Sequence, residues 1–503
     1  MSGERVSRNA GFALLAQVVS AFFTAGLTIF LARALTPDEY GYFAFGMSVI
    51  AIASLFADFG IASSTGRFIA ERRDEPAAAA AVFRTGLRLK LVVAFAAAAG
   101  LFALAGPICD LFDSPGAAGA LRALSIALFG QTVFLLLLGA FIALGVIRWN
   151  VVLTTVESVV EASSAVVFVL LGAAAAGAAL GRAVGYLTGV VVGLFVVSRV
   201  IGGLRRRSQS RSERRQVRHS AHPRVTSRMI LGYAGPLVLV DAAFRVFTSV
   251  DVLLISAIVG AGAPVAAYGL AMQLTLFLEY PAAALASAVA PRLAHARERA
   301  DSLGLLQQST RYLVIVQGLL TAPLVIWPEA IVDLLFGDKY PGAPDVLLAL
   351  TPYVFLSGIA QITTLSVNYI GEAGRRVPIA IAMLTVNIGL NLLLLPRVGI
   401  VGAAIGTSAA YAIWVPGHLW ILRRRIGLPL RPLLLTTARV LCGGAAMVAV
   451  LALLGTGDVA LPLMLVGAVV GPAVYLAVLF ALREVTPADA TTLRATLARR
   501  AAG

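Results

Sequence analysis

The chain has 503 residues, of which 59% are hydrophobic and 13% are charged, and its mean hydropathy is +0.90. Soluble domains carry about 25% charged residues, so this composition excludes an ordinary soluble protein and favours one that crosses a membrane many times. The net charge of +15 suits contact with anionic lipid head groups.

The apolar runs predict helices that span a bilayer. Each crossing needs about 20 apolar residues, and the sequence supplies about 14 such runs. In chain order they cover residues 10–34, 41–65, 85–106, 123–145, 151–173, 179–198, 230–259, 265–290, 312–334, 346–370, 377–395, 399–422, 433–454 and 461–482. The predicted fold class is an all-α polytopic membrane protein with two six-helix bundles and two additional C-terminal helices.

Basic residues are concentrated in every second gap between these runs. The enriched gaps contain Arg5, Arg8, Arg67, Arg72, Arg73, Arg148, Arg205, Arg206, Arg207, Arg297, Arg299, Arg375, Arg376, Arg423, Arg424 and Arg425. We assign to the opposite gaps only Arg33, Arg122, Arg182, Lys339 and Arg397. Cationic loops resist translocation, so this bias predicts a multi-pass protein of the inner or plasma membrane with both termini in the cytoplasm.

One long polar break, residues 199–228, divides the predicted spans. It is rich in arginine but has no aromatic residues that could stack on bases, so we expect a solvated linker near lipid and no nucleic-acid partner. Residues 40–47 resemble residues 265–272, which favours two parallel repeats. The predicted domains are a bundle at 1–198, the linker at 199–228, a second bundle at 229–425, two helices at 426–484 and a cytoplasmic tail at 485–503.

Ionisable residues inside the predicted spans are the first candidates for function, because each costs a few kcal/mol in lipid unless it faces protein or water. Asp241 and Arg245 lie four residues apart, hence on one helix face, and Asp251 follows in the same span. They form either a structural ion pair or a substrate site in which Arg245 binds an anion and Asp241 or Asp251 orients it.

A second pair of candidates is Glu157 and Glu161, which repeat the four-residue spacing. Two like charges on one face favour protonation of one of them, as in a proton or sodium site, although a simple hydrogen-bonded acid is the alternative. For Asp58 and Glu279 we favour a structural role.

Arg84 and Arg88 stand at the cytoplasmic mouth of the third predicted span. Their side chains either extend to the interface or form a cationic funnel that captures a phosphate-bearing lipid head group. We expect no metal site and no cofactor, while coupling to H⁺ or Na⁺ stays open.

Several stretches resemble the oligosaccharide flippases of polysaccharide biosynthesis, a branch of the multidrug/oligosaccharidyl-lipid/polysaccharide exporter superfamily. They are LARALTPDEYGYFAFG at 31–46, ADFGI at 57–61, SVDVLLI at 249–255, LFGDKY at 335–340 and NIGLNLLLLPRVGIVGAAI at 387–405. The resemblance covers about residues 5–425. Of the candidate site residues, only Asp251 matches an acidic position in one of these motifs.

This resemblance implies a flippase that moves a polyprenyl-(pyro)phosphate-linked oligosaccharide from the cytoplasmic to the outer leaflet by alternating access. A cation-coupled multidrug exporter of the same fold and a lipid II flippase are the alternatives. We do not expect an enzyme, because the outer gaps are too short for a catalytic domain. The expected partners are the lipid-linked oligosaccharide, membrane lipids and, in the same pathway, a polysaccharide polymerase and glycosyltransferases; we expect a monomer.

Overall fold

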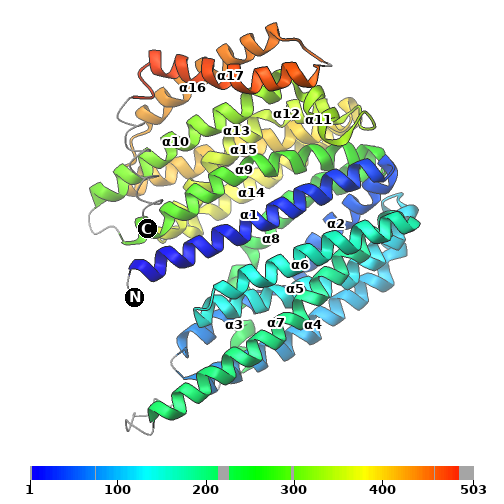
Figure 1. The fold of residues 1–503 in the computed structure, drawn as a ribbon, viewed down its shortest axis with the longest axis vertical. Helices are drawn as coiled ribbons and strands as arrows, with labels where there is room; N and C mark the ends of the chain where they lie inside the picture. Colours follow the sequence, from blue (N-terminus) through cyan, green and yellow to red (C-terminus); the bar gives the residue numbers. More distant parts are fainter. Residues whose placement is uncertain (1–2, 74, 213–225, 296–298, 458, 487–503) are drawn as a thin grey trace. The chain divides into compact units, whose positions relative to one another are not determined.

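The computed structural model describes residues 3–73, 75–212, 226–295, 299–457 and 459–486 (Figure 1). These residues form helices joined by turns, with no strand among them. In the first half of the chain the helices are α1 (Gly3–Ala34), α2 (Pro37–Asp58), α3 (Ile61–Glu71), α4 (Pro76–Leu111), η1 (Pro115–Ala117), α5 (Ala118–Leu144), α6 (Arg148–Phe168), η2 (Val169–Ala173) and α7 (Ala174–Ser212).

The second half of the chain is also helical. Its elements are α8 (Ser227–Ile258), α9 (Ala263–His295), α10 (Arg299–Ile326), α11 (Pro328–Phe336), α12 (Ala343–Ala349), α13 (Thr351–Tyr369), η3 (Ala373–Arg376), α14 (Val377–Val398), α15 (Val401–Ile426), α16 (Leu430–Leu453) and α17 (Leu461–Ala481). The predicted all-α polytopic class is thereby confirmed.

Every predicted span coincides with one helix or with two successive helices. Three spans are broken: 41–65 is α2 and α3, 312–334 is α10 and α11, and 346–370 is α12 and α13. The second break has Pro328 at the start of α11, where the missing N–H ends the preceding helix. At the third break α12 and α13 are bent by 49°.

The number of membrane crossings is only partly determined by the structure. Within the described part of the chain, eight helices are long and apolar enough to span a bilayer, or nine if the bent α12–α13 pair forms one span. One of the eight, Arg148–Gly203, includes both α6 and α7, between which the backbone turns at Gly172 and Ala174 with φ of 88° and 46°. About 14 crossings stay a prediction from the sequence.

The chain divides by its contacts into two compact units. The first contains residues 1–269 and 395–400, and the second contains residues 270–394 and 401–503. The division falls inside α9 and not in the predicted linker, so α8 belongs to the first unit. α7 continues to Ser212, which makes the start of that linker helical, while residues 213–225 and the tail from 487 lie outside the described residues. The division into six and six helices stays a prediction.

In the first unit, a stripe of glycines lets α7 approach its neighbours closely. Gly177, Gly181, Gly185, Gly189 and Gly193 recur every four residues and so lie on one face of the helix. A Cβ on this face would collide with backbone or side chains of η2, α6 and α5. Small residues of this kind permit tight helix packing in membranes, and they bring α7 against the acidic face of α6.

In the second unit, Glu484 joins the end of α17 to α10 and α16. Its carboxylate, 3% exposed, accepts hydrogen bonds from Arg311 Nε (2.8 Å), Thr436 Oγ1 (2.8 Å) and Arg439 Nη1 (2.7 Å). Burial acts to raise the pKa of this carboxyl, but the hydrogen bonds from Arg439, Arg311 and Thr436 outweigh burial and lower its pKa. The charged form therefore holds the last helix in place.

Replacing Glu484 with Gln should lower the melting temperature of the purified full-length protein at pH 7, because each hydrogen bond to a charged group contributes about 1.5–3 kcal/mol. Since the pKa is lower in the folded state, this contribution is present above the unfolded value of about 4.3 and is lost as the pH falls below it. The melting temperatures of wild type and variant should converge at low pH. A difference that is constant with pH would contradict this account.

The matched control is Glu372→Gln. Glu372 also pairs with two arginines, Arg375 and Arg425, but it is 23% exposed and its partners are at least 40% exposed. Exposed ion pairs contribute about 0–1 kcal/mol, so this variant should melt close to the wild type.

Candidate functional site

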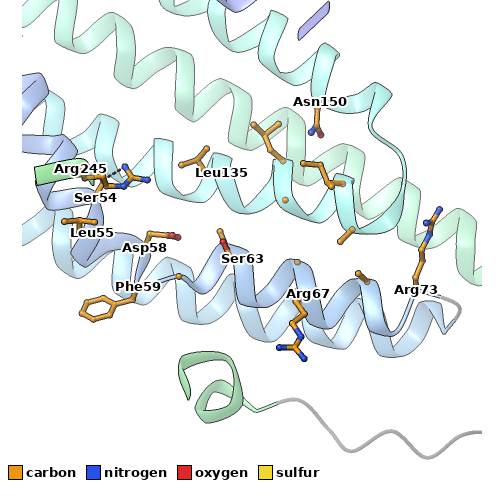
Figure 2. Close-up of a pocket in the computed structure, with 18 residues that line it drawn as sticks. Ser54, Leu55, Asp58, Phe59, Ser63, Arg67, Arg73, Leu135, Asn150 and Arg245 are labelled. Atoms are coloured by element: carbon orange, nitrogen blue, oxygen red, sulfur yellow. Dashed lines mark hydrogen bonds between the residues drawn. The ribbon is translucent and has the colours of Figure 1, made fainter. Parts of the chain in front are cut away.

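The first unit contains a cavity of about 1020 Å³ between α2, α3, α5, the start of α6 and α8. Its lining combines cationic, hydroxyl and amide groups with apolar walls, and Figure 2 shows Arg245 and Ser54 at one end and Arg73 at the other. The polar lining residues are Ser54, Asp58, Ser63, Arg67, Arg73, Asn150 and Arg245. A cavity of this size can hold a sugar-sized polar group.

Arg245 reaches the cavity from α8. Its Nη1 donates a hydrogen bond of 2.9 Å to Ser54 Oγ on α2, which is drawn in Figure 2. Ser54 in turn donates to the carbonyl oxygen of Ala51 at 2.6 Å. The guanidinium is thus oriented by a neighbouring helix, and it is one of three arginines on the cavity wall.

A buried ion pair stands behind this wall. Lys90 of α4, whose side chain is 0% exposed, donates a hydrogen bond to the carboxylate of Asp58 at the end of α2. Asp58 is 26% exposed and lines the cavity, and Lys90 also lies close enough to Arg245 to repel it. The Asp58 carboxylate therefore offsets positive charge that would otherwise accumulate on this side.

The break between α2 and α3 opens onto the same cavity. Phe59 and Gly60 both have left-handed backbone angles, with φ of 44° and 66°, and they turn the chain into α3. Gly60, Ala62 and Ser63 at the start of α3 line the cavity. The first N–H groups of a helix lack partners within that helix and carry a partial positive charge, so this end attracts anions.

Arg73 lines the far end of the cavity and contacts Gly145 at the end of α5. Gly145 ends α5 with a φ of 71°, and the guanidinium of Arg73 occupies the space that a Cβ would need there. Only glycine suits both the backbone angle and the contact. Arg67 lies nearby on α3 and forms an exposed ion pair of 2.9 Å with Glu71.

The two acids on α6 lie in a separate cluster of the first unit. Glu161 accepts a hydrogen bond of 2.7 Å from Arg182 Nη1 on α7, and Arg182 Nη2 donates to Tyr186 Oη at 3.1 Å. Glu157 is 6% exposed, hydrogen bonds with Glu161 and accepts from Ser158 Oγ at 3.1 Å. The sequence interpretation placed Arg182 in an outer gap, whereas the structure places it within α7, where it compensates one of the two acids.

Asp251, Arg84 and Arg88 are not among the residues that line the cavity. Asp251 is 4% exposed on α8 and accepts a hydrogen bond of 2.5 Å from Tyr268 Oη. Arg84 and Arg88 are exposed on α4, the helix that carries the buried Lys90. The side chain of Asp241 lies outside the described residues. A substrate-binding role for these four residues stays a prediction.

Replacing Lys90 with Met should destabilise the purified protein by about 3 kcal/mol, because it leaves the Asp58 carboxylate without its buried partner. The melting temperature in detergent measures this loss. Adding Asp58→Asn should recover part of it, since the double variant carries neither charge. Arg88→Gln, on the exposed face of the same helix, is the control and should change stability by less than about 0.5 kcal/mol. Equal melting temperatures for Lys90→Met and the wild type would contradict the assignment.

Comparison with known proteins bears on the fold and the family. Over 127 residues the chain is 28% identical to the succinoglycan biosynthesis transport protein ExoT of Rhizobium meliloti (strain 1021); the match covers 25% of this chain and 24% of that protein. The chain therefore aligns with about a quarter of that relative's length.

Two solved structures share the fold. The structure of the lipid II flippase MurJ in an inward closed conformation has a TM-score of 0.70 at 15% identity, over 94% of this chain and 99% of that one. An inward-facing multidrug resistance MATE family transporter of the MOP superfamily has a TM-score of 0.61 at 17% identity, over 81% and 94%.

The sequence itself matches a described family over more than half of its length. Residues 6–297 fit the family of polysaccharide biosynthesis proteins. The resemblance inferred from the sequence motifs is confirmed by this match and by the shared fold of the transporters. The chain belongs to the polysaccharide biosynthesis protein family.

Proposed function

We propose that this membrane protein is a flippase that moves a polyprenyl-(pyro)phosphate-linked oligosaccharide from the cytoplasmic to the outer leaflet by alternating access. The observation that carries the proposal is the cavity of the first unit, in which Arg245 and the start of α3 offer positive charge to an anion. The family, and the transport role in the name of the succinoglycan relative, support the same class of cargo.

The physical task requires a cavity of this kind. Each sugar hydroxyl costs several kcal/mol to remove from water without a new partner, and a phosphate group costs more. Arginine, serine and asparagine side chains replace that lost water, while the polyprenyl tail stays in lipid. With the cell interior negative, each anionic charge that moves outward gains about 2.3 kcal/mol per 100 mV.

In the topology predicted from the basic residues, the cavity lies toward the cytoplasmic side, where the proposed cargo would bind first. It lies at the ends of α2 and α5 and at the start of α6, next to gaps that the basic residues assign to the cytoplasm. In our proposal Arg67 and Arg73 meet the head group first and Arg245 holds its phosphate deeper in the cavity. Arg84 and Arg88 form an outer funnel, and Asp241 and Asp251 orient Arg245 or its helix.

Charge also favours this cargo over the cationic drugs that an exporter of the same fold would carry. Among the described residues, the cavity wall has three arginines and one carboxylate, Asp58, which forms an ion pair with Lys90. A cationic drug would meet a repulsive surface there.

Replacing Arg245 with Gln should abolish surface polysaccharide export while the protein stays at normal abundance in the membrane, because a neutral amide cannot hold a phosphate against its dehydration. Arg245→Lys should retain partial export, since the positive charge remains but the bidentate hydrogen bonding of the guanidinium to a phosphate is lost. Surface glycan per cell, normalised to protein amount, measures the effect. Arg397→Gln is the control. Full export by Arg245→Gln would overturn the anion-binding role.

Coupling to H⁺ or Na⁺ at Glu157 and Glu161 is part of the proposal. Arg182 compensates one negative charge, which leaves the second acid to bind a proton or a cation. Glu157→Gln and Glu161→Gln should then slow surface glycan export and leave dye efflux at the background of cells that lack the protein. Dye efflux that needs these acids and proceeds without any lipid-linked sugar would instead favour the multidrug exporter.

The partners follow from the cargo. We propose that a polysaccharide polymerase and glycosyltransferases act after and before this monomeric flippase, in the inner or plasma membrane and with both termini in the cytoplasm. If the cargo were lipid II, loss of Arg245 would stop cell-wall synthesis and growth. Loss of surface glycan with normal growth supports the oligosaccharide.

A further inference from the structure

The second unit contains an acid at the middle of an apolar helix. Glu279 lies 16 residues from each end of α9, about 24 Å along the helix in either direction. It is flanked by the apolar stretches LTLFL and YPAAALA. Residues 265–290 are one of the spans predicted from the sequence, and in that topology Glu279 lies near the depth where a charge is most costly.

Glu279 is surrounded by neutral hydrogen-bonding groups. Tyr353 Oη donates to its Oε1 at 2.6 Å, and Gln361 Nε2 donates to its Oε2 at 3.4 Å. Tyr353, Ser357 and Gln361 follow one another at four-residue steps, so one face of α13 is turned to the acid. In the part of the chain that the structure describes, no Lys, Arg or His forms an ion pair with Glu279.

This environment differs from that of Asp58 and Glu161 in the first unit. Asp58 forms an ion pair with Lys90, and Glu161 forms one with Arg182. Among the described residues, the hydrogen-bonding partners of Glu279 are hydroxyl and amide groups. Removing its charge by protonation is the available way to lower the cost of its position.

Tyr353 can satisfy Glu279 in both forms. When the acid is charged, the Tyr353 hydroxyl donates to it, as the 2.6 Å contact shows. After proton uptake the acid donates to the oxygen of Tyr353, and the hydroxyl hydrogen of Tyr353 turns to Tyr411 on α15, with which it also hydrogen bonds. The two rings meet edge to face with centroids 4.6 Å apart, which fixes the geometry.

The exposure of Glu279 differs from that of its hydrogen-bonding partners. Tyr353, Ser357 and Tyr411 are 5%, 1% and 6% exposed, whereas the Glu279 side chain is only partly buried. The hydrogen-bonding groups are thus more shielded than the acid that they contact. Apart from these tyrosines, the titratable group next to it is Tyr280 on its own helix.

We propose that Glu279 is a reversible proton-binding site of the second unit, with Tyr353 as the positioning residue, and that the proton it binds is coupled to export. One proton adds to a carboxylate oxygen on binding and leaves from it on release, with no other bond changed. The coupling rests on the proposed function; the proton site does not.

The test is a pH titration of the full-length protein in lipid vesicles, followed by infrared difference spectroscopy of the carboxylic acid C=O band. The wild-type spectrum should contain a titrating component that Glu279→Gln lacks, in addition to any component from Glu157 and Glu161. Tyr353→Phe should keep the band but move its midpoint to higher pH, because the charged form loses a donor. Glu329→Gln, with an acid outside the site, is the control and should resemble the wild type.

A band that persists unchanged in Glu279→Gln would overturn the proposal, and so would a Tyr353→Phe midpoint equal to that of the wild type. Tyr353→Phe keeps the test valid if Glu279→Gln fails to fold. Surface export with an imposed pH gradient tests the coupling: the gradient should change the rate less in Glu279→Gln than in the wild type, and an equal change in both would refute the coupling. An intact titration in a protein that exports no glycan would refute the proposed function and leave the site standing.

Discussion

The constraint on which the structure depends is that a charge inside an apolar helix bundle needs a fixed partner. The dielectric constant there is low, so an isolated ion costs far more than it does at a protein surface. Lys90 lies fully buried against Asp58, and Arg182 is held between Glu161 and Tyr186. Each contact joins two helices and orients them relative to each other within the first unit.

The two units use different chemistry to meet this constraint. In the first unit, the described residues that line the cavity include three arginines and one carboxylate, Asp58. Around Glu279 in the second unit, neutral hydroxyls and an amide surround one acid. A site that holds a permanent charge suits binding of a charged head group, whereas a site with neutral partners suits gain and loss of a proton.

Sequence reasoning located the helices because hydropathy depends on composition alone, and each predicted span overlaps helix in the structure. It found Arg245 because a charge in an apolar run is conspicuous. It missed the role of Lys90, which stands next to Arg84 and Arg88 and reads as another interfacial base. It also missed that Arg182 pairs with Glu161.

These misses have a common physical cause. The partner of Lys90 is 32 residues away in the sequence, and that of Arg182 is 21 residues away. Local periodicity does not determine which face of a helix packs against which neighbouring helix. The glycine stripe on α7, at intervals of four, is the signal that could have placed Arg182 against α6. Hydropathy cannot reveal whether a buried acid such as Glu279 has a cation beside it, so the structural role favoured from the sequence stays a prediction.

The contact between Arg73 and Gly145 has a consequence for selectivity. A missing methyl group at Gly145 lets the guanidinium lie flat against the end of α5. A larger residue at position 145 would displace that side chain. Under the proposed function, the placement of one arginine on the cavity wall thus depends on the absence of a side chain at a bend in the main chain. A substitution of Gly145 would then alter which cargo the cavity accepts while leaving Arg245 in place.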